Sequence, residues 1–226
     1  MPAVFVDGVD GAGKTTMIRE LAQSLPTVHI ADPLWRYLPA VTVPTDFAAW
    51  VTSTSAAEVA TALIDAYIHR LDDIRWRLES TGPDTVVLVD RGPRTIAASA
   101  LAHVTTRDSP DTTPDLGPAL KRLRNALREV VHSDDCITVE LRVTRYQAIL
   151  HRLSNNERAD PRYLRYLSAF LQQFKAEPPW PGTRAIALDA TADLAANASS
   201  LQANLSAWIG GVTRGSSGGW ACCTVR

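Results

Sequence analysis

Ala3-Val-Phe-Val-Asp-Gly-Val-Asp-Gly-Ala-Gly-Lys-Thr-Thr16 is the stretch that decides the fold of this chain. Its apolar beginning predicts a buried strand, and the residues from Met17 to Leu25 predict the helix that follows. Between them, residues 8–15 have the pattern Gly-x-x-x-x-Gly-Lys-Thr, which is a P-loop. A chance glycine-rich turn is the alternative. The coincidence of strand, glycine spacing, Lys-Thr and helix argues against it.

The loop has the composition of a phosphate-binding site. Glycines let backbone N–H groups approach a polyphosphate, and the helix start adds unpaired N–H groups and a positive dipole end. Lys14 can reach the β- and γ-phosphates of ATP, and the Thr15 hydroxyl can ligate Mg²⁺. We therefore expect ATP and Mg²⁺ as cofactors. The expected nucleotide-binding residues form the loop and the first helical turn: Asp10, Gly11, Ala12, Gly13, Lys14, Thr15 and Thr16.

Composition limits the remaining function classes. The chain has 226 residues, 46% of them hydrophobic, and a net charge of -1, which suits one α/β domain and gives no electrostatic case for nucleic acid or membrane partners. No apolar run approaches the roughly 20 residues of a membrane span, and no signal-peptide pattern is present. Cys136, Cys222 and Cys223 match neither a disulfide framework nor a zinc site. We therefore expect a reduced, cytoplasmic protein.

A second strand signal ends in two charged residues. Residues 85–89, Thr-Val-Val-Leu-Val, are typical of a strand buried on both faces, and Asp90 and Arg91 follow it. In P-loop folds an Asp at such a strand end can hold the Mg²⁺ shell, so Asp90 is a predicted metal residue together with Thr15. Arg91 should reach the same cleft. A salt-bridged strand end is the alternative.

Three other side chains have two interpretations each. Asp32 ends a short strand predicted at residues 27–31, at the sheet edge where ligands of open α/β folds bind, and Trp35 follows closely. A loop Asp and a Trp that covers the core explain this pair equally well. Arg70 lies at the border of the apolar stripe of a helix predicted over residues 55–79. Its position favours extension to solvent over an anion-holding place in a cleft.

The remaining patterns complete a three-layer α/β P-loop fold with a parallel sheet of about five strands, in a single domain at residues 1–209. Arginines at residues 144–177 indicate a lid at about 144–160 that closes over the transferring group, with an exposed, ion-paired helix as the alternative. The Gly/Ser-rich segment 210–226 predicts a disordered tail. The other predicted helices lie at 95–104, 118–132 and 192–209, and the other strands at 136–141 and 184–188.

Four short motifs resemble those of the thymidylate kinase family. Residues 7–16 are similar to its E-G-x-D-G-A-G-K-[ST]-T loop, Asp32-Pro33 to its carboxylate-Pro, and Asp90-Arg91 to its D-R motif. Arg70 lies 21 residues before Arg91, which is the family's spacing for an arginine that contacts the acceptor nucleotide. Arg152 and the Asn-Glu-Arg-Ala-Asp stretch ending at Asp160 look like its arginine lid.

The resemblance implies a kinase that transfers the γ-phosphoryl group of ATP to a nucleoside monophosphate, dTMP-like or modified, and it implies a homodimer. By this resemblance Lys14, Arg152 and Arg158 would stabilise the transferring group, and Thr15 and Asp90 would hold Mg²⁺. Arg70 and Arg91 would bind the acceptor's phosphate, and Asp10 would lie near its sugar. The expected acceptor-site residues are Asp7, Asp10, Asp32, Trp35, Arg70 and Arg91.

The sequence matches this family where phosphate is handled and departs from it where the base would be bound. The departures are Asp7 for Glu, Ala31 for Arg, His69 for Asp, Gly92-Pro93 for an aromatic residue, and Ser99 for Tyr.

A second hypothesis is an alcohol acceptor. Asp32-Pro33 with Trp35 also resembles the Glu-Pro-Val-x-x-Trp stretch of deoxynucleoside kinases, in which the carboxylate serves as base toward a 5′-hydroxyl. Asp32 would then be catalytic, because a hydroxyl acceptor benefits from a base. A nucleotide-binding scaffold without activity is a third hypothesis. A GTPase switch is disfavoured because none of the three lysines follows an Asn, as the guanine clamp requires.

Overall fold

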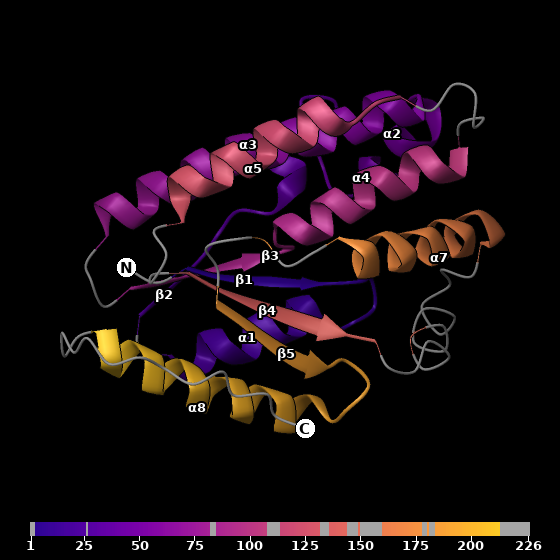
Figure 1. Ribbon diagram of the computed structural model, residues 1–226. Coiled ribbons are helices and arrows are strands. Elements are labelled where there is room, and N and C mark those ends of the chain that lie inside the picture. Colours follow the sequence, from indigo (N-terminus) through magenta and orange to yellow (C-terminus); the bar gives the residue numbers. More distant parts are fainter. Residues whose placement is uncertain are drawn as a thin grey trace.

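The computed structural model describes residues 3–25, 27–81, 85–107, 114–131, 136–143, 149, 160–177, 180 and 184–212. A parallel five-stranded sheet with the order β2-β3-β1-β4-β5 lies at its centre (Figure 1). The strands are β1 (Ala3–Gly8), β2 (Val28–Ile30), β3 (Val86–Asp90), β4 (Cys136–Arg142) and β5 (Arg184–Asp189). This arrangement confirms the predicted three-layer α/β fold with five parallel strands.

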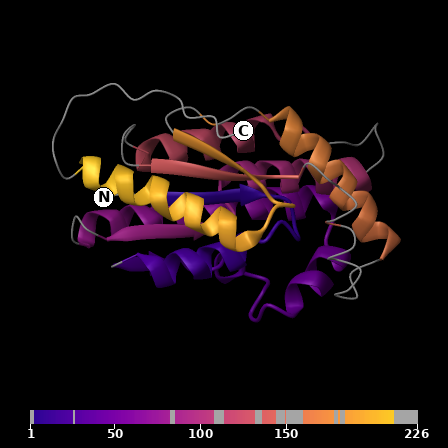
Figure 2. The same ribbon diagram turned by 90° about the horizontal axis from the view of Figure 1, so that it is seen from below.

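Helices cover both faces of the sheet, which explains the continuous apolar runs of β1 and β3 (Figures 1 and 2). Alternate residues of a strand point to opposite faces, so Phe5 and Val89 enter one core, while Val4 and Leu88 enter the other. The helices on one face are α3 (Ala56–Ser80), α4 (Pro93–Arg107), α5 (Gly117–Val130) and α7 (Pro161–Ala176). Those on the other face are α1 (Lys14–Ser24) and α8 (Leu194–Val212).

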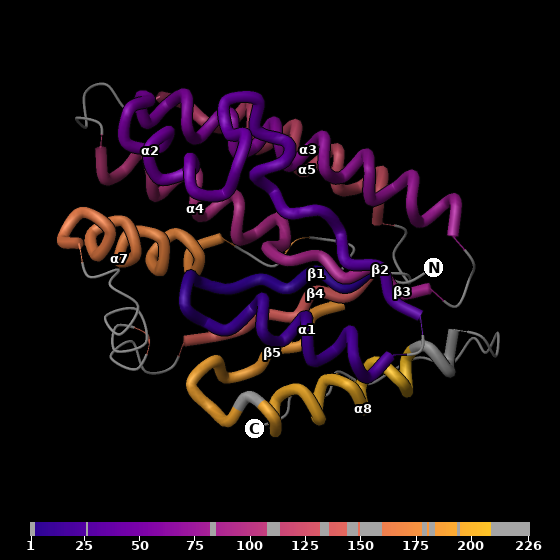
Figure 3. The backbone as a smooth tube through the Cα atoms, turned by 180° about the vertical axis from the view of Figure 1, so that it is seen from behind, coloured from indigo at the N-terminus to yellow at the C-terminus, as the bar shows by residue number. Residues whose placement is uncertain are grey.

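Local sequence signals account for several helix boundaries. Ser55 and Glu58 form a reciprocal capping box at the start of α3, and the Asp160 carboxylate accepts a hydrogen bond from the Arg162 N–H at the start of α7. Between β2 and α3 the chain forms the short helices η1 (Leu34–Tyr37) and α2 (Asp46–Ser53), which lie beside α3 (Figure 3). No helix was predicted at residues 34–37, so η1 was missed.

Several boundaries differ from the sequence predictions; α4, for example, runs from Pro93 to Arg107 rather than over residues 95–104. β2 has three residues rather than the expected five, because Pro33 follows closely and limits pairing. α8 ends at Val212, three residues inside the segment predicted to be a disordered tail. Residues 213–226, with Cys222 and Cys223, lie outside the described residues, whereas Cys136 is buried in β4 as expected. Among the helices of the described residues, none is long and apolar enough to cross a bilayer.

Candidate active site

The P-loop joins the carboxyl end of β1 to the start of α1. Gly13 occupies the N-cap position of α1 with φ of 89°, a left-handed conformation that glycine adopts without steric cost. Lys14 begins the helix, and its Nζ lies back over the loop and donates a hydrogen bond to the Val9 carbonyl at 2.8 Å. The loop therefore places one ammonium group beside the helix N-terminus, where the dipole also favours anions.

The Lys14 ammonium is buried among charges of both signs. It is 5% exposed and lies 3.9 Å from an Asp10 carboxylate oxygen. Burial and the charge of Arg91 lower the pKa of Lys14 to about 8, against the opposing influence of Asp10 and Asp90. An anionic ligand would compensate for the burial and favour the charged ammonium. This environment is suited to binding polyphosphate.

Thr15 and Asp90 meet at the end of β3, as predicted for a metal site. The Thr15 hydroxyl donates a 2.6 Å hydrogen bond to Asp90 Oδ2, and Asp90 Oδ1 is buried with no hydrogen-bond partner among the described residues. These oxygens are the hard ligands that Mg²⁺ prefers, usually one or two protein oxygens completed by water and phosphates. No cluster of three or more His, Cys, Asp or Glu that could hold a metal is present in the described part. The donor set therefore fits a Mg²⁺ ion shared with a bound nucleotide.

Asp10 connects the P-loop to the residue after β3 and to α7. Arg91, in the left-handed region with φ of 64°, places Nη1 2.8 Å from Asp10 Oδ1, and the Tyr163 hydroxyl donates to Asp10 Oδ2 at 3.3 Å. Burial would raise the pKa of Asp10, but Arg91 and Lys14 outweigh it and lower the pKa to about 2. Asp10 is thus an ionised carboxylate that orients Arg91. The strained backbone of Arg91 is of the kind that concentrates at functional sites.

Arg70 points into the molecule, so the sequence-based preference for extension to solvent was wrong. Its side chain is fully buried on the inner face of α3, stacks over Tyr67 at 5.8 Å, and donates Nη1 to the Asp90 carbonyl at 2.6 Å. Burial lowers the pKa of Arg70 despite the opposing influence of Tyr67 and Asp90. Its Nε and Nη2 are buried and have no hydrogen-bond partner among the described residues. Two donors of a buried guanidinium are therefore uncommitted at the end of β3.

Asp7 lies beneath the site, away from its surface. It is 1% exposed, and its Oδ1 accepts hydrogen bonds from the N–H and the hydroxyl of Thr95 at 2.8 and 2.7 Å. The Thr95 hydroxyl also accepts the Gly8 N–H at 3.0 Å, so Asp7 joins the start of the P-loop to α4. A Cβ at Gly92 would lie 2.5 Å from the carboxylate, which explains the absence of a side chain there. We expected substrate contact from Asp7, and the structure places it behind the site instead.

Asp32 and Trp35 lie apart from the P-loop cluster. Asp32 Oδ1 accepts from Arg36 Nη1 at 2.7 Å, and Oδ2 lies 3.8 Å from Arg77 Nη2 on α3. Trp35, a residue of η1, packs against the core, with the Arg36 guanidinium 5.9 Å from its ring centroid. These contacts match the interpretation of a loop Asp and a Trp that covers the core. No contact between Asp32 and Lys14 or Asp90 occurs in the described structure.

The face of α7 toward α4 contributes side chains that the sequence analysis missed. The hydroxyl groups of Ser99 and Tyr166 are 2.7 Å apart, so α7 supplies a tyrosine hydroxyl at the position where the resemblance led us to expect a tyrosine on α4. His103 stacks on Tyr166 with ring centroids 4.5 Å apart, and burial lowers the pKa of His103 to about 4. Aromatic residues recur at 163, 166, 170 and 174, a helical spacing that could have indicated this face.

The predicted lid falls on residues whose structure is not described. Arg152 and Arg158 lie outside the described residues, and only Ile149 and Asp160 of the segment 144–160 lie within them. The roles expected for the two arginines therefore stay predictions.

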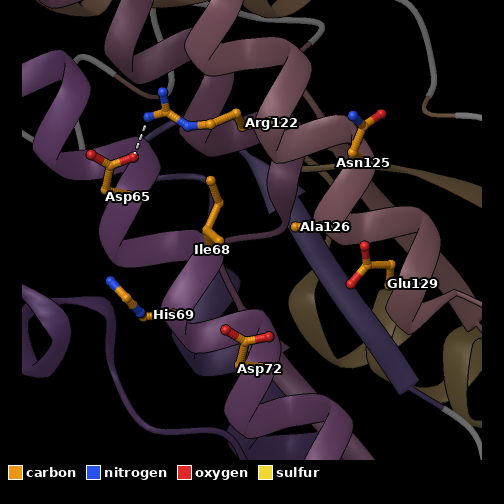
Figure 4. Close-up of a pocket in the computed structure, with 8 residues that line it drawn as sticks. All are labelled: Asp65, Ile68, His69, Asp72, Arg122, Asn125, Ala126 and Glu129. Atoms are coloured by element: carbon orange, nitrogen blue, oxygen red, sulfur yellow. Dashed lines mark hydrogen bonds and ion pairs between the residues drawn. The ribbon is translucent and has the colours of Figure 1, made fainter.

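A groove between α3 and α5 is separate from this site (Figure 4). It has a volume of 470 Å³ and includes an Arg122–Asp65 ion pair of 2.6 Å at one end. None of its residues belongs to the P-loop, β3 or Arg91. Its lining residues are Asp65, Ile68, His69, Asp72, Arg122, Asn125, Ala126 and Glu129.

Comparison with known proteins places the fold among nucleoside and nucleotide kinases. No protein-family model and no curated protein matches the sequence. Among solved structures, thymidylate kinase from Candida albicans has a TM-score of 0.61 at 14% identity over 91% of each chain. Deoxyadenosine kinase from M. mycoides with bound dCTP has a TM-score of 0.56 at 15% identity, over 91% of this chain and 99% of that chain. The likeness confirms the three-layer α/β P-loop fold that the sequence predicted.

Proposed function

We propose that this protein is a Mg²⁺-dependent kinase that transfers the γ-phosphoryl group of ATP to a nucleoside monophosphate. The complete P-loop, the Thr15–Asp90 pair and the kinase fold support phosphoryl transfer. The observation that carries the choice of acceptor is Arg70, whose buried guanidinium has two uncommitted donors. A cytoplasmic location and a homodimer belong to the same proposal, on the cysteine content and the family resemblance.

Arg70 favours an anionic acceptor because of the cost of its burial. A buried guanidinium loses hydration, and among the described residues that of Arg70 gains one hydrogen bond, to the Asp90 carbonyl, while the charge of Asp90 compensates only in part. A phosphate group could accept hydrogen bonds from both free nitrogens, in the bidentate arrangement to which arginine is suited. A neutral hydroxyl acceptor would leave the charge uncompensated.

The chemistry then depends on positioning and charge. A phosphate oxygen of a monophosphate is already anionic, so transfer needs no strong general base. Lys14 at the P-loop and Arg91, held by Asp10, would neutralise charge on the donor and acceptor phosphates. Thr15 and Asp90 would hold Mg²⁺, which when bound would further neutralise charge on the phosphates. Arg70 would align the acceptor oxygen for in-line attack.

The alternative with Asp32 as a base toward a hydroxyl has weaker support. One of the structural neighbours is a deoxyadenosine kinase, described with the products dCMP and dCDP, at 14% identity and a TM-score of 0.55. In the present chain, however, the Asp32 carboxylate lies between Arg36 and Arg77. Both of its oxygens therefore already pair with arginine guanidinium groups rather than being left for an acceptor hydroxyl.

The test is ADP release measured against nucleoside monophosphates, nucleosides and non-nucleotide alcohols, with Mg²⁺ and ATP. We expect turnover with one or more monophosphates, and none with Lys14→Met under the same conditions. Turnover only with nucleosides or other alcohols would overturn the proposed acceptor. Tight ATP binding without ADP release for any acceptor would support a non-catalytic scaffold instead.

A further inference from the structure

A buried ion pair joins three elements around the proposed site. Glu140 of β4 binds the guanidinium of Arg94 at the start of α4, and the two side chains are 7% and 10% exposed. Arg94 also donates Nη2 to the Phe174 carbonyl near the end of α7 at 2.6 Å, and its guanidinium lies 4.3 Å from the Phe174 ring centroid. One guanidinium therefore holds α4, β4 and α7 together.

Burying the Arg94–Glu140 ion pair to join three elements costs free energy of hydration. Apolar side chains of similar volume often stabilise a core at least as well as a buried ion pair, because both charges lose hydration. Arg94 Nε is in addition buried without a hydrogen-bond partner among the described residues. What the guanidinium provides is direction, since planar hydrogen bonds to a β4 carboxylate and to an α7 carbonyl restrict both the tilt and the rotation of the helix.

The opposite end of α7 reaches the site. Tyr163 contacts Asp10 of the P-loop, and Tyr166 contacts Ser99. Phe174 lies 11 residues beyond Tyr163, which corresponds to about 16 Å along the helix. A tilt of about 4° around Phe174 would therefore move Tyr163 by roughly 1 Å, a displacement that can cost up to about 100-fold in rate near reacting groups.

We propose that Arg94 and Glu140 are positioning residues that hold α7 so that Tyr163 and Tyr166 form one wall of the acceptor site. The inference rests on the proposed function, because it assigns the wall to the acceptor. Arg142 supports the pair from outside: its Nε and Nη2 lie 3.0 and 2.9 Å from Glu140 Oε2, and its side chain is 59% exposed. Glu140 is thus fixed at both oxygens before it orients Arg94.

The test replaces the ion pair by apolar side chains in the double variant Arg94→Met with Glu140→Leu. We expect KM for the monophosphate acceptor to rise about tenfold or more, while KM for ATP changes less than twofold. Arg94→Lys, which keeps a charge opposite Glu140 but not the planar guanidinium, should give a smaller rise. Arg122→Gln, which breaks a surface ion pair between α5 and α3, is the matched control and should leave both constants unchanged.

Hydrogen exchange of α7 separates this inference from the proposed function. We expect amides of residues 160–177 to exchange faster in the double variant, with α5 amides unchanged, even if no acceptor is found. The positioning role would be overturned if α7 exchanged equally fast in the natural protein and the double variant and KM for the acceptor were unchanged. It would also be overturned if KM for the acceptor and KM for ATP rose equally. If the double variant does not fold, Arg94→Lys carries the same measurements. Absence of turnover in the unaltered protein would contradict the proposed function only.

Discussion

Two carboxylates lie at the carboxyl ends of neighbouring parallel strands, Asp90 as the last residue of β3 and Asp32 two residues after β2, yet their surroundings differ. Asp90 accepts a hydrogen bond from Thr15, and within the described part of the chain its buried Oδ1 and two nitrogens of the neighbouring Arg70 have no hydrogen-bond partner. Asp32 follows the edge strand β2, and Arg36 and Arg77 pair with its two oxygens. Position at the carboxyl edge of the sheet is therefore insufficient to identify a site. Uncommitted hydrogen-bonding capacity in a buried place is the better indicator.

The largest expected effect comes from Asp90→Asn. The substitution keeps the shape of the side chain but removes the negative charge that would hold Mg²⁺ with Thr15, so we expect kcat to fall roughly 100- to 1,000-fold. The amount of Mg²⁺ needed for half-maximal activity should rise. Steady-state kinetics across a Mg²⁺ titration provide the measurement. Thr15→Ser, which keeps a hydroxyl group, is the control. If Asp90→Asn needed the same Mg²⁺ concentration as the natural protein, Asp90 would not be a ligand of the metal.

The phosphate-binding residues could be predicted from the sequence, because they lie in continuous stretches with a recognisable pattern. The spacing of Gly8, Gly13 and Lys14 encodes the loop, and two buried strand signals place Thr15 and Asp90 at one sheet edge. The five parallel strands follow from the same alternation of apolar runs and helices. The short helix η1 was missed, and the boundaries of several elements, including β2, α4 and α8, differ from those predicted.

The acceptor side could not be predicted in the same way, because its geometry depends on contacts between distant segments. Arg70 lies at the border of an apolar stripe, and helical periodicity gives the angle of a side chain without showing what covers it. The Ser99–Tyr166 contact joins residues 67 positions apart, and no local pattern encodes that pairing. The resemblance to known motifs identified Asp32 as a candidate residue. Its environment, however, depends on arginines from η1 and α3, which no motif predicts.

Asp7→Asn tests the buried carboxylate that joins the start of the P-loop to α4. Burial raises the pKa of Asp7 to about 6, against the hydrogen bonds from Thr95, from an ordinary value of 3.8. The folded protein therefore binds more protons than the unfolded chain between these values. The stabilising contribution of protonated Asp7 is complete below pH 3.8 and is lost as pH rises through 6. The difference corresponds to about 3 kcal/mol of unfolding free energy.

We therefore expect the stability difference between the natural protein and Asp7→Asn to change by that amount between pH 4 and pH 7, in favour of the Asn variant at the higher pH. Urea unfolding at several pH values provides the measurement. Asp72→Asn, at a residue with a 57% exposed side chain, is the control and should show no such trend. A stability difference that does not vary with pH would mean that Asp7 titrates at its ordinary value.

Arg70→Gln tests whether the free donors beside Asp90 bind the acceptor. The variant keeps some hydrogen-bonding capacity but loses the charge and the bidentate geometry, so we expect KM for a monophosphate acceptor to rise roughly 10- to 100-fold. KM for ATP should change much less. Arg77→Gln on the same helix, which contacts Asp32 and Asp73 instead, is the matched control. If both substitutions changed the KM of the acceptor equally, Arg70 would not be the residue that binds the monophosphate.

The smallest effect is expected for Asp32→Asn, and this result is the one that most sharply separates the two carboxylates. If the acceptor is a monophosphate, its oxygen is already ionised, and the loss of the Asp32 charge affects only the exposed pairs with Arg36 and Arg77. Exposed ion pairs contribute at most about 1 kcal/mol, so we expect kcat to stay within threefold of the natural protein. The same assay with nucleosides gives the decisive contrast. A loss of turnover in Asp32→Asn, with ATP binding intact, would make Asp32 the base and an alcohol the acceptor, because only a hydroxyl group needs a carboxylate to take its proton.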